Sequence, residues 1–282
     1  METGENNTAL IKTSNFNIDL SEQYHLSIEI DLYTFTFCVL DIKTLTYVYL
    51  EKKIYNKNQK KYSHFLTSVI NNNEILNSKF SSISISFSGF PNSLIPKSLY
   101  DKKYVKKVLN LHTNSSDNIF TNDLYLHEAK IIYAIPEEIT TTINTFFPTA
   151  YYNCSENILI SQYTKLKKAG KTNYIDVKKD SINITILDGE RLLLNNTYKF
   201  LTKEDFLYYI LYSFEQLNLI TEKDPVVLSG DISEKDENYK IIYQYIKNID
   251  FINRPKQITF PNEFKSIKEH QYFGLFGQVL CE

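Results

Sequence analysis

The sequence contains the same structural pattern twice, and neither copy has glycine in the turn that follows its first strand. The first copy runs over Tyr24–Lys52 and the second over Asn173–Leu201. In each, alternating apolar residues predict a strand that ends in Asp, a second strand, a short turn and a third strand, together an antiparallel meander. Backbone that wraps a phosphate usually needs glycine beside such an Asp, but Tyr33 and Lys178 stand there. The repeat therefore predicts a duplicated fold and argues against phosphate chemistry.

The composition is that of an ordinary globular protein. The chain has 282 residues, enough for one large domain or two of ordinary size; 43% are hydrophobic and 23% are charged. A formal net charge of −2 gives no support for a general nucleic-acid surface. We therefore expect nucleic acid not to be a partner.

The cysteines and the apolar runs bear on the compartment. Cys38, Cys154 and Cys281 are few and widely spaced, which is unlike a disulfide framework. No charged-then-apolar signal pattern opens the sequence, and no run reaches the roughly 18 apolar residues of a membrane span. We expect a cytoplasmic protein that has no membrane partner.

Further elements are predicted by residue spacing between and after the two meanders. The expected helices cover residues 62–76, 97–109, 137–147, 155–169, 203–217, 239–246 and 270–281. The expected strands cover 80–87, 127–135, 225–230 and 249–252, and residues 111–123 are expected to form a polar loop. Helices between parallel strands must cover the sheet, so we predict an α/β fold. Its expected parts are a flexible tail or edge strand over 1–22 and two halves over 23–170 and 171–282.

Four segments, in this order along the chain, resemble motifs of the actin-like superfamily of sugar kinases, heat-shock chaperones and actin-like secretion and pilus adaptors. Asp31-Leu-Tyr-Thr resembles its first phosphate motif, Asp-x-Gly-Thr. Ile131–Pro136 resembles the strand and proline that open its connecting helix. Asp176-Val-Lys-Lys resembles its second phosphate motif, Asp-x-Gly-Gly, and Val226–Asp231 resembles the strand and glycine pair on its adenosine side.

The chain also resembles a Bacteroidetes family known as domain of unknown function 3822. The similar phrases are Leu94–Asp101, Ile131–Pro136, Val226–Ile232 and Phe273–Glu282. The two resemblances imply two ribonuclease-H-like (actin-like ATPase) subdomains. Each would be a mixed five-stranded sheet with a three-stranded antiparallel meander and flanking helices. In the superfamily, nucleotide lies between the halves, whereas the second family implies a fold and no activity.

Two interpretations of the Asp-ending strands remain open. If nucleotide binds, the resemblance places it at Asp31, Thr34, Asp176, Ser229, Gly230 and Asp231. The other interpretation, which we favour, is that Asp31 and Asp176 accept backbone N–H bonds in turns, because Tyr33 and Lys178 should obstruct phosphate. We therefore expect no catalytic residue and no cofactor, with ATP and Mg²⁺ only under the alternative function.

Other motifs are weak. Gly170–Thr172 mimics the end of a phosphate-binding loop, but Lys165 stands where that loop needs glycine. The five histidines include no pair at zinc-binding spacing, so we expect no metal site. Two groups of lysines could contact an acidic partner or simply be solvated: Lys102, Lys103, Lys106 and Lys107, and Lys165, Lys167, Lys168 and Lys171. The Tyr-rich helix Phe206–Glu215 could be core or interface.

From these features we expect a non-catalytic actin-like scaffold or adaptor protein, in effect a pseudoenzyme. It would bind a protein partner through the cleft between its halves or through a Tyr-rich face. The sequence is also compatible with a homodimer. The alternative is a divergent nucleotide-binding ATPase or kinase that uses Asp31 and Asp176 on the metal and Ser229 and Gly230 near the nucleotide.

Overall fold

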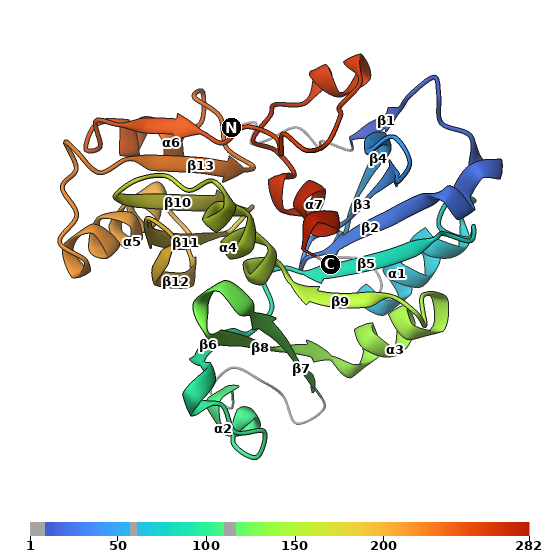
Figure 1. Cartoon of the computed structure of the whole chain (residues 1–282), viewed down its shortest axis with the longest axis horizontal. Helices are drawn as coiled ribbons and strands as arrows, with labels where there is room; N and C mark the ends of the chain where they lie inside the picture. Colours follow the sequence, from blue (N-terminus) through green and yellow to red (C-terminus); the bar gives the residue numbers. More distant parts are fainter. Residues whose placement is uncertain (1–8, 57–60, 110–116, 282) are drawn as a thin grey trace. The chain divides into compact units, whose positions relative to one another are not determined.

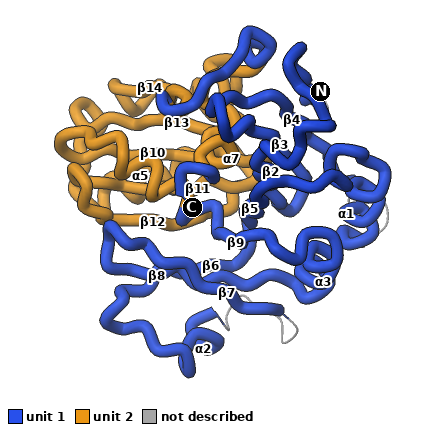
Figure 2. The backbone as a smooth tube through the Cα atoms, turned by 45° about the vertical axis from the view of Figure 1, so that its right-hand side comes forward, with its two compact units in different colours: residues 1–157, 256–266, 278–282 blue, residues 158–255, 267–277 orange. Residues whose placement is uncertain are grey.

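The computed structural model describes residues 9–56, 61–109 and 117–281 (Figure 1). The chain divides into two compact units (Figure 2): unit 1 is residues 1–157, 256–266 and 278–282, and unit 2 is residues 158–255 and 267–277. The division falls inside helix α4 (Ser155–Lys165), whereas the boundary expected from the sequence lay at residue 170. The first turn of α4 bonds back to the preceding strand, Asn157 Nδ2 donating to Asn153 Oδ1 at 2.8 Å, and this holds it in unit 1.

Unit 1 is built on a six-stranded sheet. Its order is β1 (Leu10–Lys12), β4 (Thr46–Ile54), β3 (Thr34–Asp41), β2 (Tyr24–Ile30), β5 (Ser82–Phe87) and β9 (Tyr151–Cys154). β2, β3 and β4 form the predicted antiparallel meander, and β5 and β9 continue the sheet in parallel. Six strands stand where five were expected, because β1 pairs with β4 as the edge strand that the sequence left open. β9 was not predicted.

Strand β2 is buried on both faces, and the two faces differ in chemistry. Leu26, Ile28 and Ile30 point to one side and form apolar core. His25, Ser27 and Glu29 point to the other side and are equally buried. The buried polar face needs hydrogen-bond partners, and these come from distant parts of the chain.

Helices α1 (Tyr62–Asn71) and α3 (Glu137–Phe146) belong to the same unit and contact each other.

A second, three-stranded antiparallel sheet completes unit 1. Its order is β6 (Asn92–Pro96), β8 (Ala129–Pro136) and β7 (Asp117–Leu124). The polar loop expected over 111–123 is wrong from residue 117 onward, and its earlier part lies outside the described residues. β7 is polar because only part of it is covered, and its strand conformation comes from pairing with the apolar β8.

The helix expected over 97–109 is also wrong. A 3₁₀ turn η2 (Lys97–Leu99) and a short helix α2 (Val105–Leu109) replace it. Tyr100 between them is extended, with φ −74° and ψ 118°. Asp101 Oδ1 then accepts the Lys103 N–H at 2.9 Å, an Asx turn that competes with the helix.

Unit 2 is a five-stranded sheet, as the resemblance implied. Its order is β12 (Arg191–Lys199), β11 (Ser181–Asp188), β10 (Lys171–Val177), β13 (Val226–Gly230) and β14 (Ile249–Phe251). Helices α5 (Lys203–Gln216) and α6 (Glu237–Tyr243) contact each other. The core combines Ile175, Ile184 and Leu228 of the sheet with Phe206 and Ile210 of α5.

The duplication is visible in strand pairing. In unit 1 the first hairpin pairs Ile30 with Phe35, and in unit 2 it pairs Val177 with Ile182. Each meander has a register shift in its second hairpin, between Val39 and Leu40 in one and between Ile186 and Leu187 in the other. Each shift lies just before the Asp that ends its strand, so the two copies share their irregularity as well as their topology.

The C-terminal segment was expected to be one apolar helix over 270–281. It is instead α7 (Phe273–Gly277) in unit 2 followed by the 3₁₀ turn η5 (Gln278–Leu280) in unit 1. Phe273 of α7 packs with Tyr163 and Tyr174 in the core of unit 2, whereas Gln278 of η5 bonds to β2 and β5 of unit 1. The helix therefore does not continue across residues 277 and 278. No helix in the described parts of the chain combines the length and apolar character needed to cross a bilayer.

Helix α5 begins with the predicted cap. Thr202 Oγ1 accepts the Asp205 N–H, and the Asp205 carboxylate accepts the Thr202 N–H, each at 3.1 Å. We predict that Thr202→Ala lowers the free energy of unfolding by about 1 kcal/mol, because it leaves a helix N-terminal N–H without its acceptor. Urea unfolding measures this. Thr141→Ala on the exposed side of α3 is the control and should cost no stability, because Ala has a higher helix propensity than Thr; equal losses in both variants would contradict the prediction.

Candidate functional site

The first Asp-ending strand closes a self-contained turn in unit 1. Asp31 Oδ1 accepts the N–H groups of Tyr33 at 2.6 Å and Thr34 at 2.7 Å. The Thr34 hydroxyl donates to Asp31 Oδ2 at 2.9 Å, and the Asp31 N–H donates to the Thr34 carbonyl at 3.0 Å. Both carboxylate oxygens therefore hold the β2–β3 turn, as an Asp in a turn commonly does.

The second Asp-ending strand lies in unit 2 and enters a buried hydroxyl chain. Parallel pairing of β10 with β13 places Asp176 directly opposite Ser229. The Ser229 hydroxyl donates to Asp176 Oδ1 at 2.7 Å, and Tyr163 of α4 lies 2.9 Å from the Ser229 oxygen. Since a hydroxyl has one proton, Tyr163 is the donor to Ser229. Burial, reinforced by the negative charge of Asp176, raises the pKa of Tyr163 well above its ordinary value.

Lys178 follows Asp176 at the start of the β10–β11 turn. Its ammonium lies 3.9 Å from Asp176 Oδ2, and its backbone N–H donates to the Ser181 carbonyl at 2.9 Å. The side chain thus supplies a positive charge beside the carboxylate. Obstruction of a phosphate by Lys178 stays a prediction.

Gly230, at the end of β13, is used for close packing of backbone. Its φ is +85°, and a Cβ there would lie 2.2 Å from the Val177 carbonyl oxygen. Its N–H donates to the His270 carbonyl at 3.0 Å, and the next N–H, of Asp231, donates to the Val177 carbonyl at 2.7 Å. Only glycine fits, and the reason lies inside the protein rather than in a ligand.

A small pocket adjoins the carboxyl ends of β10 and β13 within unit 2. Its volume is about 290 Å³, near the lower end of the range for small-molecule sites. Its charged lining residues are Lys178, Lys179, Asp231, Asp236 and Glu237. The carboxylates offset the lysines, so the pocket has no excess positive charge for a polyphosphate.

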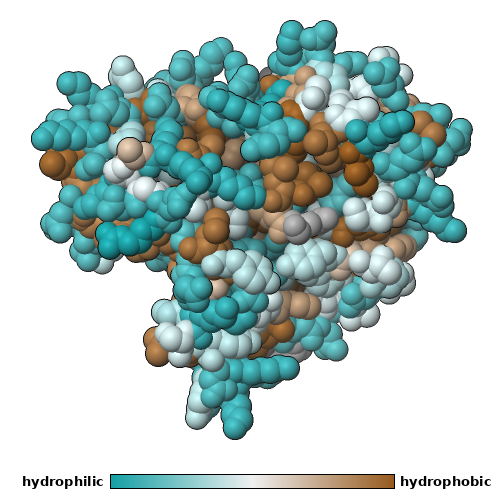
Figure 3. Space-filling model, in the orientation of Figure 1, coloured by the Kyte–Doolittle hydropathy of each residue, from teal (hydrophilic) through white to brown (hydrophobic). Residues whose placement is uncertain are grey.

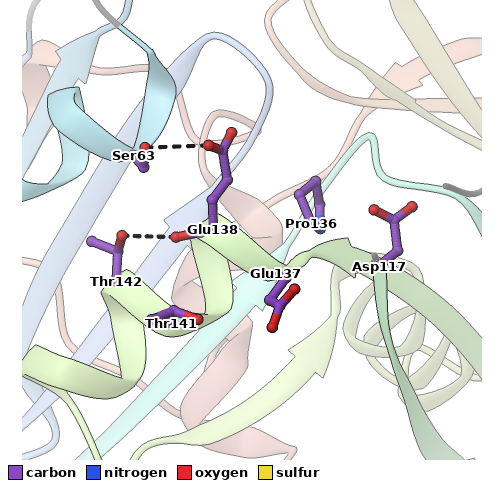
Figure 4. A pocket seen from close by; sticks show the side chains of 7 residues that line it. All are labelled: Ser63, Asp117, Pro136, Glu137, Glu138, Thr141 and Thr142. Atoms are coloured by element: carbon purple, nitrogen blue, oxygen red, sulfur yellow. Dashed lines mark hydrogen bonds between the residues drawn. The ribbon is translucent and has the colours of Figure 1, made fainter. Parts of the chain in front are cut away.

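A larger pocket lies in unit 1, with a volume of about 670 Å³ (Figure 4). It is lined by Ser63 of α1, Asp117 of β7, and Pro136, Glu137, Glu138, Thr141 and Thr142 at the start of α3. The Glu138 side chain points toward Ser63, and Glu137 points away from it. Three carboxylates line the pocket without a lysine or arginine, which disfavours phosphate. This pocket was not predicted, because Asp117 was expected to lie in a loop.

The polar face of β2 forms a hydrogen-bond network that was not predicted from the sequence. Gln278 of η5 accepts from the Ser84 hydroxyl at 2.8 Å and donates to Ser86 at 2.7 Å and to the Ile28 carbonyl at 2.9 Å. His25 lies between Ser82 at 2.8 Å and Ser84 at 2.9 Å. The alternation of Ser with Ile and Phe along β5 was the available signal, but its distant partner Gln278 was not visible.

Burial governs the titration of this network. It lowers the pKa of His25 to about 4, so the imidazole is neutral at neutral pH. Because the Ser84 proton goes to Gln278, the ring donates through Nε2 to Ser84 and accepts from Ser82 through Nδ1. No group of three or more His, Cys, Asp or Glu side chains in the described part of the chain is arranged to hold a metal ion.

The predicted site residues thus fall into two groups. Asp31 and Thr34 belong to unit 1, and Asp176, Ser229, Gly230 and Asp231 belong to unit 2. Within unit 2, strand pairing brings Asp176 and Ser229 together, and Gly230 and Asp231 are held against Val177. Their assignment to a nucleotide stays a prediction.

Comparison with known proteins identifies a family and a fold for this chain. Residues 13–249 match the family described as "Protein of unknown function (DUF3822)". A crystal structure from Bacteroides thetaiotaomicron VPI-5482, of a protein with an actin-like ATPase fold and unknown function, matches with a TM-score of 0.81 at 20% identity. The match covers 95% of this chain and 99% of that one.

Two further likenesses are weaker. The structure of a PilM–PilN type IV pilus biogenesis complex matches with a TM-score of 0.58 at 10% identity, over 91% of this chain and 98% of that one. A tRNA uridine(34) hydroxylase of Rickettsia bellii (strain RML369-C) is 29% identical over 119 residues, which are 42% of this chain and 45% of the relative. The chain therefore matches less than half the length of that curated relative. The structural likenesses show the fold: an α/β, actin-like ATPase fold with ribonuclease-H-like topology.

Proposed function

This chain belongs to the DUF3822 family and has an actin-like ATPase fold, and on that premise we propose that it is a non-catalytic scaffold or adaptor that binds a protein partner. In this proposal the fold acts as a rigid support. The turns at the positions of the phosphate motifs form hydrogen bonds within the protein and do not bind a ligand.

One observation carries the proposal: the turn groups that would meet a phosphate already have partners inside the chain. In unit 1 the N–H groups of Tyr33 and Thr34 donate to Asp31. In unit 2 the N–H groups of Lys178, Gly230 and Asp231 donate to backbone carbonyls. A phosphate site built from backbone needs several free N–H groups that point at the ligand. Binding here would require these bonds to break first.

A protein partner is supported by the surface chemistry and by one likeness. The Tyr-rich helix α5 buries Phe206, Ile210 and Phe214, while Tyr208 and Tyr212 are 60% and 40% exposed and stack at 5.9 Å. Exposed tyrosine is typical of protein interfaces. The PilM–PilN structure is a complex of two proteins, and this chain is similar to it in fold.

The test is titration of the protein with nucleotide. We expect isothermal titration with Mg-ATP, Mg-ADP and Mg-GTP to give no binding heat up to millimolar concentration, and the melting temperature to stay unchanged. A ligand at one hundred times its dissociation constant would add about 2.7 kcal/mol to the free energy of unfolding, so a real site would be visible.

The alternative of a divergent nucleotide-binding protein has one observation in its favour. The 290 Å³ pocket lies at the carboxyl ends of parallel strands, where α/β sheets bind ligands. If nucleotide raised the melting temperature of the natural protein and that rise vanished in Asp176→Asn, the scaffold proposal would be wrong. Asp188→Asn, at the other end of the same hairpin, is the matched control.

A further inference from the structure

An exposed apolar group lies at one end of the three-stranded sheet of unit 1. Leu99 is 74% exposed in η2, and Tyr125 and Leu126 are 80% and 66% exposed in the 3₁₀ turn η3 (Tyr125–His127). The Lys97 N–H donates to the Glu128 carbonyl at 2.8 Å, which brings the two turns to the same end of the sheet. Isolated exposed apolar residues are common on protein surfaces, whereas larger exposed apolar patches are characteristic of interaction sites.

The neighbouring helix α2 extends the group. Val105 and Leu109 hold α2 against Ile132 of β8. Tyr104 and Val108, one turn apart and beside the buried pair, are 54% and 46% exposed. We use the name α2 surface for five apolar or aromatic residues, Leu99, Tyr104, Val108, Tyr125 and Leu126, together with the exposed lysines within residues 97–107.

Those lysines give the α2 surface a strong positive charge. Five exposed lysines stand within residues 97–107, namely Lys97, Lys102, Lys103, Lys106 and Lys107, against a single carboxylate, Asp101. Asp101 is engaged in its own turn with the Lys103 N–H. Among the residues the structure describes, no carboxylate lies within ion-pair distance of these lysines, and Lys107 lies 5.4 Å from the centre of the Tyr104 ring.

The other lysine group differs. Lys167 pairs with Glu190 at 3.0 Å, and the Lys171 ammonium donates to the Leu217 carbonyl at 2.8 Å. Solvation and local pairing therefore account for that group. In contrast, the charge at α2 is concentrated, uncompensated by described neighbours and mixed with apolar side chains.

We propose that the α2 surface is the docking site for an acidic, amphipathic segment of the partner protein; this rests on the proposed scaffold function and names the partner's chemistry. Asp and Glu side chains of the partner would pair with the lysines, and its aliphatic or aromatic side chains would cover Leu99, Tyr125 and Leu126. Charge complementarity selects an acidic occupant and speeds its association, while apolar burial supplies affinity.

An anionic membrane is the less favoured occupant. Surface-binding helices insert one continuous apolar face, whereas here the apolar residues are spread over two 3₁₀ turns and a helix of five residues. The region of α2 and β6 is largely hydrophilic on the face shown, with small hydrophobic areas among the hydrophilic side chains (Figures 1 and 3).

The experiment is selection of random 16-residue peptides displayed on phage against the full chain, followed by affinity measurement of the synthetic peptides. We expect the selected peptides to be rich in Asp and Glu and to contain Leu, Phe or Trp. Their affinity should fall at least about tenfold in Lys102→Glu/Lys106→Glu/Lys107→Glu and in Leu99→Ser/Tyr125→Ser/Leu126→Ser. All six positions are exposed, so both variants should fold.

Two matched controls are available: Lys165→Glu/Lys167→Glu/Lys168→Glu for charge, and Tyr243→Ser/Tyr245→Ser for exposed aromatic residues. Peptides that lose affinity in the controls but not in the α2 variants would overturn this site and leave the scaffold function standing. Failure to select any peptide, preferential binding to vesicles of phosphatidylglycerol, or a dimer that the α2 variants dissociate would overturn the proposed occupant. Failure of the scaffold function would instead appear as nucleotide binding.

Discussion

Replacement of Gly230 by alanine is expected to unfold unit 2 or to cost more than about 4 kcal/mol of its free energy of unfolding. The φ of +85° alone costs a residue with a Cβ about 1–2 kcal/mol. The new Cβ would also lie 2.2 Å from the Val177 oxygen and 3.0 Å from the Val177 nitrogen and carbonyl carbon. This backbone cannot move cheaply, because Val177 is paired on both sides, with Ile182 and with Gly230. Costs this large come from such specific clashes.

Gly189→Ala is the matched control for this experiment. Its φ is +62°, and no atom lies within 4 Å of the added Cβ, so only the conformational cost of about 1–2 kcal/mol remains. Urea unfolding followed by circular dichroism compares the two variants. If Gly230→Ala were no worse than Gly189→Ala, close backbone packing would not explain the glycine. A role in approach to a ligand would then return as the explanation.

The second large effect is a loss of stability in acid that depends on His25. The folded protein protonates His25 at a pKa of about 4, while the unfolded chain does so at 6.5. Between these values the unfolded chain binds more protons, so the free energy of unfolding falls as the pH falls. This lowering of the His25 pKa contributes about 3 kcal/mol to the free energy of unfolding. The contribution is present in full above pH 6.5 and is lost by pH 4.

Urea unfolding at steps between pH 7 and pH 4 measures this effect. Burial also lowers the pKa of His127 and His270, so they add slopes of the same sign. The informative quantity is therefore the difference between the natural protein and His25→Gln, which should have a shallower slope over this window. His64→Gln, at an exposed position of α1, serves as the control. Equal slopes in His25→Gln and the natural protein would contradict a buried neutral imidazole.

Much of the fold was predictable because the repeated meanders have strong local patterns. Alternating apolar residues identified β2, β3 and β4 and their counterparts β10, β11 and β12, and a capping pair identified the start of α5. The errors lie where local pattern and tertiary context disagree. β7, for example, is a polar strand that exists because β8 pairs with it. The error over 97–109 is of another kind, because a local Asx turn at Asp101 breaks the helix that the composition indicated.

The site shows the same division. That Asp31 and Asp176 end their strands was visible in the chain, but the groups that meet their carboxylates were not. Asp31 is satisfied by residues two and three positions away, whereas Asp176 meets Ser229, which is 53 residues away in sequence, and through it Tyr163 of another element.

By itself, the sequence determined the duplicated α/β architecture and the absence of glycine at two turns, because strand periodicity and backbone freedom are local properties of the chain. Only the tertiary structure decided what the remaining polar groups do. It directed the N–H groups of Gly230 and Asp231 to His270 and Val177, and it placed Gln278 across the polar face of β2. The physical reason is that a buried donor must find an acceptor, and which acceptor it meets depends on segments brought together by folding.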